Sequence, residues 1–166
     1  MTNIASVPAL QQLTRELTFI EKGLLGFESM LRYELTVYDP ETPFYWLRSK
    51  EDSEVAFIVM EPCWLLDDYS FDLSDEDMRL LNVLSEEDVF LLVVCTIPEN
   101  PLEMTANLLG PLVFHRESNL GRQLILDRHK YPVRFPVFQN HEAGQDPAQG
   151  TSPEQAPEDQ PRKDMP

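Results

Sequence analysis

The sequence predicts a mostly β protein, a small antiparallel β-barrel or barrel-like sandwich with one short helix and a disordered C-terminal tail. Segments typical of strands recur at roughly ten-residue intervals. Turn-forming glycines, prolines and asparagines separate them. A chain of 166 residues is long enough for one domain with its own core. At this size a closed barrel is favoured, because closure removes exposed strand edges.

Three segments alternate between apolar and polar residues, which is the pattern of a strand with one buried face. They are residues 17–19, 31–37 and 131–137. Pro132 and Pro136 confine the last segment to a sheet edge, because proline has no N–H to donate to a neighbouring strand.

Five further segments are apolar throughout and rich in β-branched or aromatic residues, which favours buried strands. They are Phe44–Leu47, Val55–Met60, Val89–Ile97, Leu108–Phe114 and Leu124–Leu126.

One segment is typical of a helix. Ser74 and Asp77 have the spacing of an N-terminal capping pair. Asp75 and Glu76 add negative charge at the end of the helix where the backbone dipole is positive. An apolar side follows, formed by Met78, Leu80 and Leu81. We therefore expect a short helix beginning after Ser74.

The composition changes near Gln139. Residues 1–138 are predicted to form a single β domain. Residues 139–166 are acidic and rich in Pro and Gln, with almost no large apolar side chain. Such a segment cannot bury enough apolar surface to offset the entropy lost on ordering, so it is predicted to be a disordered tail.

The sequence contains neither the pattern of a targeting peptide nor that of a membrane-spanning segment. No apolar run approaches the roughly 20 residues that span a bilayer. Met1–Pro8 contains no basic cluster leading into an apolar stretch. We therefore expect no signal peptide and a cytoplasmic protein.

The net charge of −16 narrows the classes of partner. Nucleic acids and anionic membranes need basic surfaces, so direct binding to either is not expected. A protein of this charge suits a basic partner, and mutual repulsion favours a monomer when it is free.

The acidic residues are concentrated in one segment. Glu51–Glu103 holds fifteen acids against one base, Arg79, whereas Met104–Phe138 holds five bases against two acids. This segregation predicts a surface that docks a basic partner, although most acidic runs are simply solvated. The candidate docking residues are Asp67, Asp68, Asp72, Glu86, Glu87 and Asp88.

No pattern for catalysis, metal binding or cofactor binding is present, and we expect no enzyme activity and no cofactor. Cys63 and Cys95 lie in apolar surroundings without a nearby Cys or His, which favours buried thiols over a metal site. The adjacent acids Asp67–Asp68 and Glu86–Asp88 are more typical of surface solvation than of acid–base chemistry.

The segment around Asn107 allows two interpretations. Asn107, Leu108, Leu109 and Pro111 enter an apolar run that a proline interrupts. Asn107 can be structural, with its side chain bonded to nearby backbone. Alternatively, the segment is an open strand edge that receives a partner.

A series of short motifs runs along residues 17–134. They are Gly23–Glu28, Pro43–Ser49 with Glu51–Asp52, Ala56–Phe57, Pro62, Asp68–Tyr69, Asp88–Val89, Thr96–Ile97, Ala106–Val113, Gly121–Leu126 and Tyr131–Arg134. In the order and spacing of these motifs the chain resembles the FliW family of flagellar assembly factors. The chain departs from the family pattern at Arg48, Gly110 and Phe114–His115.

The resemblance implies two protein partners. Such proteins bind flagellin in the cytoplasm and also bind CsrA, an RNA-binding regulator that represses flagellin translation. Binding to FliW removes CsrA from messenger RNA, and flagellin competes for FliW. From the segregation of charge we predict that the acidic residues dock CsrA. We also predict that flagellin binds the apolar edge of the Asn107 segment, around Leu108–Val113. The alternative function is a dedicated acidic chaperone for flagellin with no regulatory role.

Overall fold

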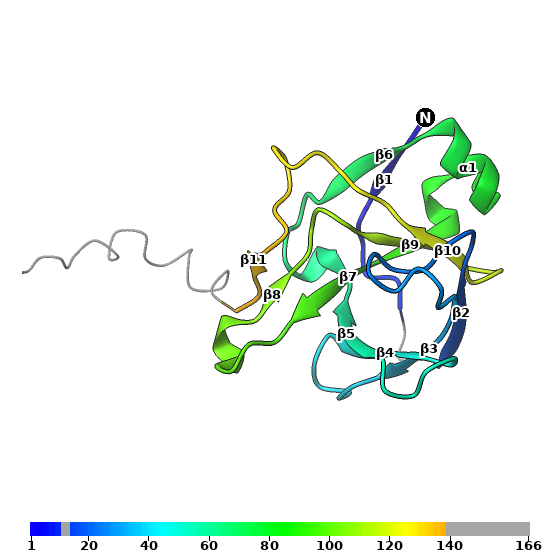
Figure 1. Ribbon diagram of the computed structural model, residues 1–166. Coiled ribbons are helices and arrows are strands. Elements are labelled where there is room, and N and C mark those ends of the chain that lie inside the picture. Colours follow the sequence, from blue (N-terminus) through cyan, green and yellow to red (C-terminus); the bar gives the residue numbers. More distant parts are fainter. Residues whose placement is uncertain (11–13, 139–166) are drawn as a thin grey trace, which may run out of the picture.

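Seven strands close into a barrel in the computed structural model, which describes residues 1–10 and 14–138 (Figure 1). Around the barrel the order is β7 (Val89–Thr96), β5 (Ala56–Met60), β4 (Phe44–Ser49), β3 (Arg32–Val37), β2 (Arg15–Phe19), β10 (Leu120–Gln123) and β9 (Leu112–His115). A second pairing of β9 with β7 completes the ring. The mostly β, barrel-forming prediction is confirmed, whereas the predicted tail lies outside the described residues.

One seam of the barrel is parallel. Strands β10 and β2 run in the same direction, with Leu120 beside Thr18 and Gly121 beside Phe19. Every other pair in the ring is antiparallel. The barrel is therefore not antiparallel throughout.

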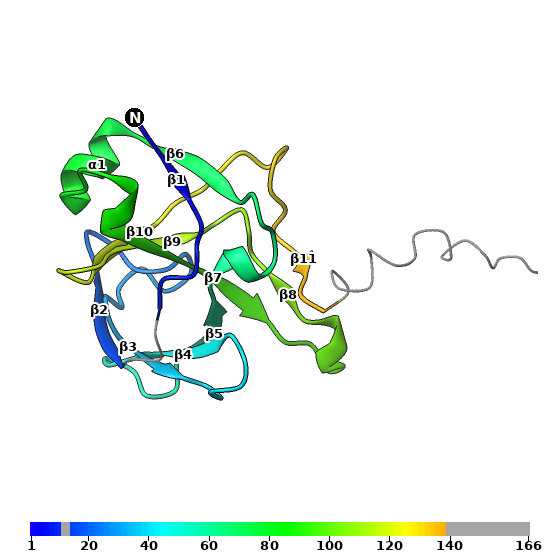
Figure 2. The same cartoon turned by 180° about the vertical axis from the view of Figure 1, so that it is seen from behind.

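An extension of the barrel sheet and a separate two-stranded ribbon flank the barrel. Strand β7 continues past it to pair with β8 (Thr105–Ala106), which pairs with β11 (Phe135–Pro136). A separate antiparallel ribbon joins β1 (Thr2–Ala5) to β6 (Ser70–Leu73). Figure 2 shows this ribbon beside the helix α1 (Asp75–Leu81), at the end of the barrel away from β3 and β4.

The core has two parts that share strand β7. Phe90 and Leu92 point into the barrel, where Phe114 packs on Phe90 at 5.7 Å and on Phe19 at 5.2 Å between ring centroids. The alternate residues of β7 join a second cluster with residues of the ribbon and of α1. Burial on both faces explains why the sequence of β7 is apolar without alternation.

The predicted helix is confirmed with its cap. Helix α1 begins after Ser74, whose Oγ accepts a hydrogen bond from the Asp77 backbone N–H at 3.0 Å. Short 3-10 helices occur at η1 (Pro62–Trp64), η2 (Glu86–Asp88) and η3 (Pro101–Glu103).

Three predicted strands are wrong in extent or place. In the run Leu108–Phe114, strand β9 begins only at Leu112, because residues 107–110 form a side-chain-capped turn. Residues 124–126 follow β10 rather than forming a strand. They still lie beside the earlier segment, since Leu124 N–H donates to the Pro111 carbonyl at 2.9 Å. Of residues 131–137, only Phe135–Pro136 is a strand.

Candidate functional site

Acidic side chains gather on both sides of strand β1. Asp67, Asp68 and Asp72 lie on the β6 side, where the Ser6 N–H donates to the Tyr69 carbonyl at 2.9 Å. Glu86 and Glu87 lie on the other side, in η2, which packs against β1. We call these five residues the acidic face.

The carboxylates of the acidic face are largely unused by the fold. Among the described residues, those of Asp67, Asp68, Glu86 and Glu87 form no hydrogen bond or ion pair. Only Asp72 is engaged, accepting from the Asn3 amide at 3.1 Å. All five residues are exposed. Their charge is therefore available to a partner.

Asp88 has a structural role instead. Its Oδ2 accepts from the Leu84 and Ser85 backbone N–H groups at 2.8 and 2.9 Å, which closes a capping box on η2. These two hydrogen bonds hold the pKa of the carboxyl below its usual value. We therefore leave Asp88 out of the acidic face, although the sequence placed it among the docking candidates.

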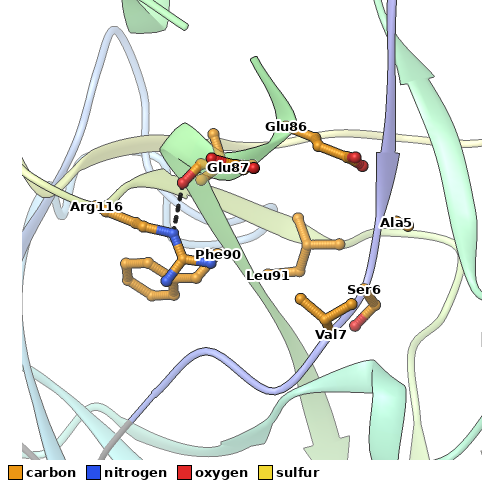
Figure 3. A pocket seen from close by; sticks show the side chains of 9 residues that line it. Ala5, Ser6, Val7, Glu86, Glu87, Phe90, Leu91 and Arg116 are labelled. Atoms are coloured by element: carbon orange, nitrogen blue, oxygen red, sulfur yellow. Dashed lines mark hydrogen bonds between the residues drawn. The ribbon is translucent and has the colours of Figure 1, made fainter.

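A hollow of about 200 Å³ opens between β1 and η2 (Figure 3). Leu91 and Phe90 of strand β7 are apolar residues that line it, and Val7 is 57 % exposed. Glu86 lies at the end opposite Arg116, whose Nε donates to the Glu87 carbonyl at 2.7 Å. A lysine or arginine side chain suits such a site, because its stem is apolar and its head is cationic.

The Asn107 segment is not an open edge. The Asn107 Oδ1 accepts from the Leu109 and Gly110 N–H groups, both at 3.0 Å, as the structural interpretation predicts. Leu108, Leu109 and Pro111 are buried. The following strand, β9, is paired on both sides, so a partner strand cannot add there without displacing β7 or β10. The open-edge interpretation is wrong.

His115, one of the departures from the family pattern, organises a turn. Its Nδ1 accepts from the Glu117 and Ser118 N–H groups at 3.2 and 3.3 Å, between β9 and β10. The side chain is 9 % exposed, so it supports the connection rather than a surface site.

Glu61 is a buried acid that the sequence analysis did not single out. It is 3 % exposed, and its Oε2 accepts from the Ala9 and Leu10 N–H groups at 2.7 and 3.2 Å. Burial is the main influence on its pKa, which it raises above the ordinary value of 4.5. Glu61 directly follows a five-residue apolar strand, and this position is the feature of the sequence that indicates a buried acid.

Glu61→Gln is expected to change how stability depends on pH. Because the folded protein holds the Glu61 proton more tightly than the unfolded chain does, the contribution of Glu61 to stability falls as pH rises from 4.5 through the raised pKa. Glutamine does not titrate, and its carbonyl can still accept from Ala9 and Leu10. The variant should therefore gain stability relative to the parent as pH rises.

Urea unfolding of both proteins between about pH 5 and pH 8 measures this difference in the free energy of unfolding. Subtracting one free energy of unfolding from the other removes the contributions of the other titrating acids, because both proteins contain them. A difference that stays constant over the range would contradict a raised pKa for Glu61.

Neither thiol has the lowered pKa that is typical of a reactive cysteine. Burial raises the pKa of Cys95 to about 12 and also raises that of the half-buried Cys63. Within residues 1–10 and 14–138, no group of three His, Cys, Asp or Glu side chains could hold a metal ion. The same residues include no helix long and apolar enough to cross a membrane.

Comparisons with known proteins agree on one family. The family model described as FliW protein matches residues 8–137. The flagellar assembly factor FliW of Caldicellulosiruptor saccharolyticus is 36 % identical over 122 residues, which cover 74 % of this chain and 80 % of the relative. That of Clostridium botulinum is 39 % identical over 124 residues, covering 75 % and 87 %.

A solved structure extends the similarity to the fold. The crystal structure of the flagellar assembly factor FliW matches with a TM-score of 0.67 and 29 % identity. The match covers 82 % of this chain and 96 % of that one. Each of these descriptions refers to flagellar assembly or to the family, and none refers to a reaction.

Proposed function

This chain belongs to the FliW family of flagellar assembly factors, and we propose that it links flagellin synthesis to flagellin use by binding two proteins in the cytoplasm. One is CsrA, whose repression of flagellin translation it relieves. The other is flagellin, which competes with CsrA for it. The observation that carries the proposal is the acidic face, whose unpaired carboxylates include Glu86 and Glu87 beside the hollow of Figure 3.

Electrostatics support CsrA as a partner, because CsrA binds RNA. A protein that holds RNA must present basic residues to the phosphates. The acidic face offers carboxylates at Asp67, Asp68, Glu86 and Glu87 that need not break an internal ion pair in order to bind. When such a surface docks beside the RNA site, its charge attracts the regulator and repels the phosphate backbone.

Competition by flagellin can arise in two ways. Flagellin either overlaps the CsrA surface or binds elsewhere and lowers CsrA affinity through a coupling free energy. The buried Asn107 segment does not present itself to flagellin as an open edge, so a flagellin surface elsewhere on the barrel is favoured.

Isothermal titration of the purified protein tests the proposal. It is titrated with CsrA, then with flagellin, and flagellin is added to a preformed complex with CsrA. We expect binding in both single titrations and release of CsrA in the third. A parallel assay with CsrA bound to flagellin messenger RNA should show the RNA released.

Two results would overturn the regulatory part. Flagellin binding without CsrA binding would leave the dedicated chaperone as the function. If CsrA stayed bound after flagellin was added to the complex, the proposed competition would be wrong.

A further inference from the structure

Trp64 stands exposed between two hollows. It ends η1, and 53 % of the residue is accessible. Each hollow has a volume of about 330 Å³, and both are lined by Trp64 and by the loop Glu41–Pro43. We call the two hollows together the Trp64 groove. An exposed tryptophan with space on both sides is a surface that a ligand can cover.

The walls of the Trp64 groove are aromatic, aliphatic and proline surfaces. One hollow adds Leu10, Pro40, Tyr45 and Glu61. The other adds Phe44, Met60, Leu65, Val137 and Phe138. Grooves lined by aromatic rings are the usual receptors for proline-containing segments, because such segments lose little conformational entropy on binding.

The chain itself contains a segment that suits the groove. We propose that Gln160–Lys163 in the C-terminal tail docks in the Trp64 groove, with Pro161 against the indole and the two basic side chains toward the exposed Glu41. Arg162 and Lys163 are the only two bases among residues 139–166, against six acids. The remainder of the tail therefore has no comparable attraction to Glu41, the exposed carboxylate that lines both hollows.

The connection to the barrel makes this docking feasible. The tail continues directly from Phe138, which is itself a wall of the groove. Residues 139–159 provide 21 residues of connection, and a linker of that length spans about 25 Å on average. Tethering at this length corresponds to an effective concentration of about 1 mM, so even weak binding would occupy the groove for much of the time.

Docking would make the tail a competitor for this surface. A partner that needs the Trp64 groove must first displace Gln160–Lys163, whereas a partner that binds only the acidic face need not. The proposal does not depend on which proteins those partners are, so its test uses the purified chain alone.

Trp64 provides the measurement once it is the single tryptophan. Trp46→Phe removes the other indole and keeps an aromatic ring at that position under Arg48. In this background we compare acrylamide quenching of Trp64 in the full chain and in the variant Arg162→Glu/Lys163→Glu. Release of the tail is expected to raise the quenching constant about twofold, because the tethered contact is only partly occupied.

Two matched variants separate the contribution of the two charges from that of the proline ring. The swap Arg162→Lys/Lys163→Arg keeps both charges and should quench like the parent. Pro161→Gly keeps both charges but removes the ring, and it should raise the quenching constant as the charge reversal does. Circular dichroism confirms that all variants keep the fold.

Either of two results would overturn the proposal. One is equal quenching of the parent, the charge reversal and Pro161→Gly. The other is shielding of Trp64 that grows with protein concentration, which would place the tail of one chain on another.

Discussion

Gly121→Ala is expected to destabilise the barrel by about 3 kcal/mol or more, because an added methyl has no space. A Cβ at this position would lie 2.2 Å from the Phe114 ring and 2.4 Å from the Val113 carbonyl oxygen. Neither neighbour can move cheaply. Phe114 is packed between Phe19 and Phe90, and Val113 belongs to the ladder between β9 and β10.

The position of Gly121 in the topology enlarges the effect. It pairs with Phe19 across the parallel seam and with Phe114 across the antiparallel one. Relief of the clash must therefore separate β10 from β2 or from β9. Urea unfolding of the parent and the variant, followed by circular dichroism, gives the difference in the free energy of unfolding.

Gly110→Ala is the matched control. Its Cβ would meet the side-chain amides of Gln123 at 2.9 Å and Asn107 at 3.1 Å, and the ends of these side chains can shift. We expect its stability to stay within about 1 kcal/mol of the parent. A loss as large as that of Gly121→Ala would contradict the steric explanation.

The strands that could be predicted from the sequence are those whose burial produces a recognisable pattern of apolar residues. Strand β3 alternates because one face points into the barrel, and β7 is apolar throughout because both of its faces are buried. Strand β1 could not be recognised, since its four residues include only one buried apolar side chain, Ile4. It is a strand because β6, some 70 residues away in sequence, pairs with it.

The same distinction holds for the candidate site. The excess of acids is visible in the sequence, but the acidic face exists only because β1 lies between β6 and η2. The capping role of Asp88 can be predicted from the sequence, since Ser85 and Asp88 have the same spacing as the capping pair Ser74 and Asp77. The buried run at Leu108 has the sequence of a strand without forming one, because a loop packed into the core is as apolar as a strand.

Glu86→Lys/Glu87→Lys is expected to weaken the proposed binding to CsrA by about 10- to 100-fold at low salt. The two carboxylates border the hollow of Figure 3 and have no partner among the described residues. Reversing them should therefore leave the fold intact while replacing attraction to a basic surface with repulsion. Titration calorimetry measures the affinity, and the loss should shrink as salt screens the exposed charges.

A change of net charge alone must be separated from a local contact, because the whole protein is acidic. Glu99→Lys/Glu103→Lys changes the net charge by the same amount on the connection between β7 and β8, away from the acidic face. If both double variants weakened binding equally, long-range attraction would explain it and the acidic face would lose its special role. A large loss confined to Glu86 and Glu87 would place the regulator against η2. The hollow beside β1 would then be the place to seek its lysine or arginine.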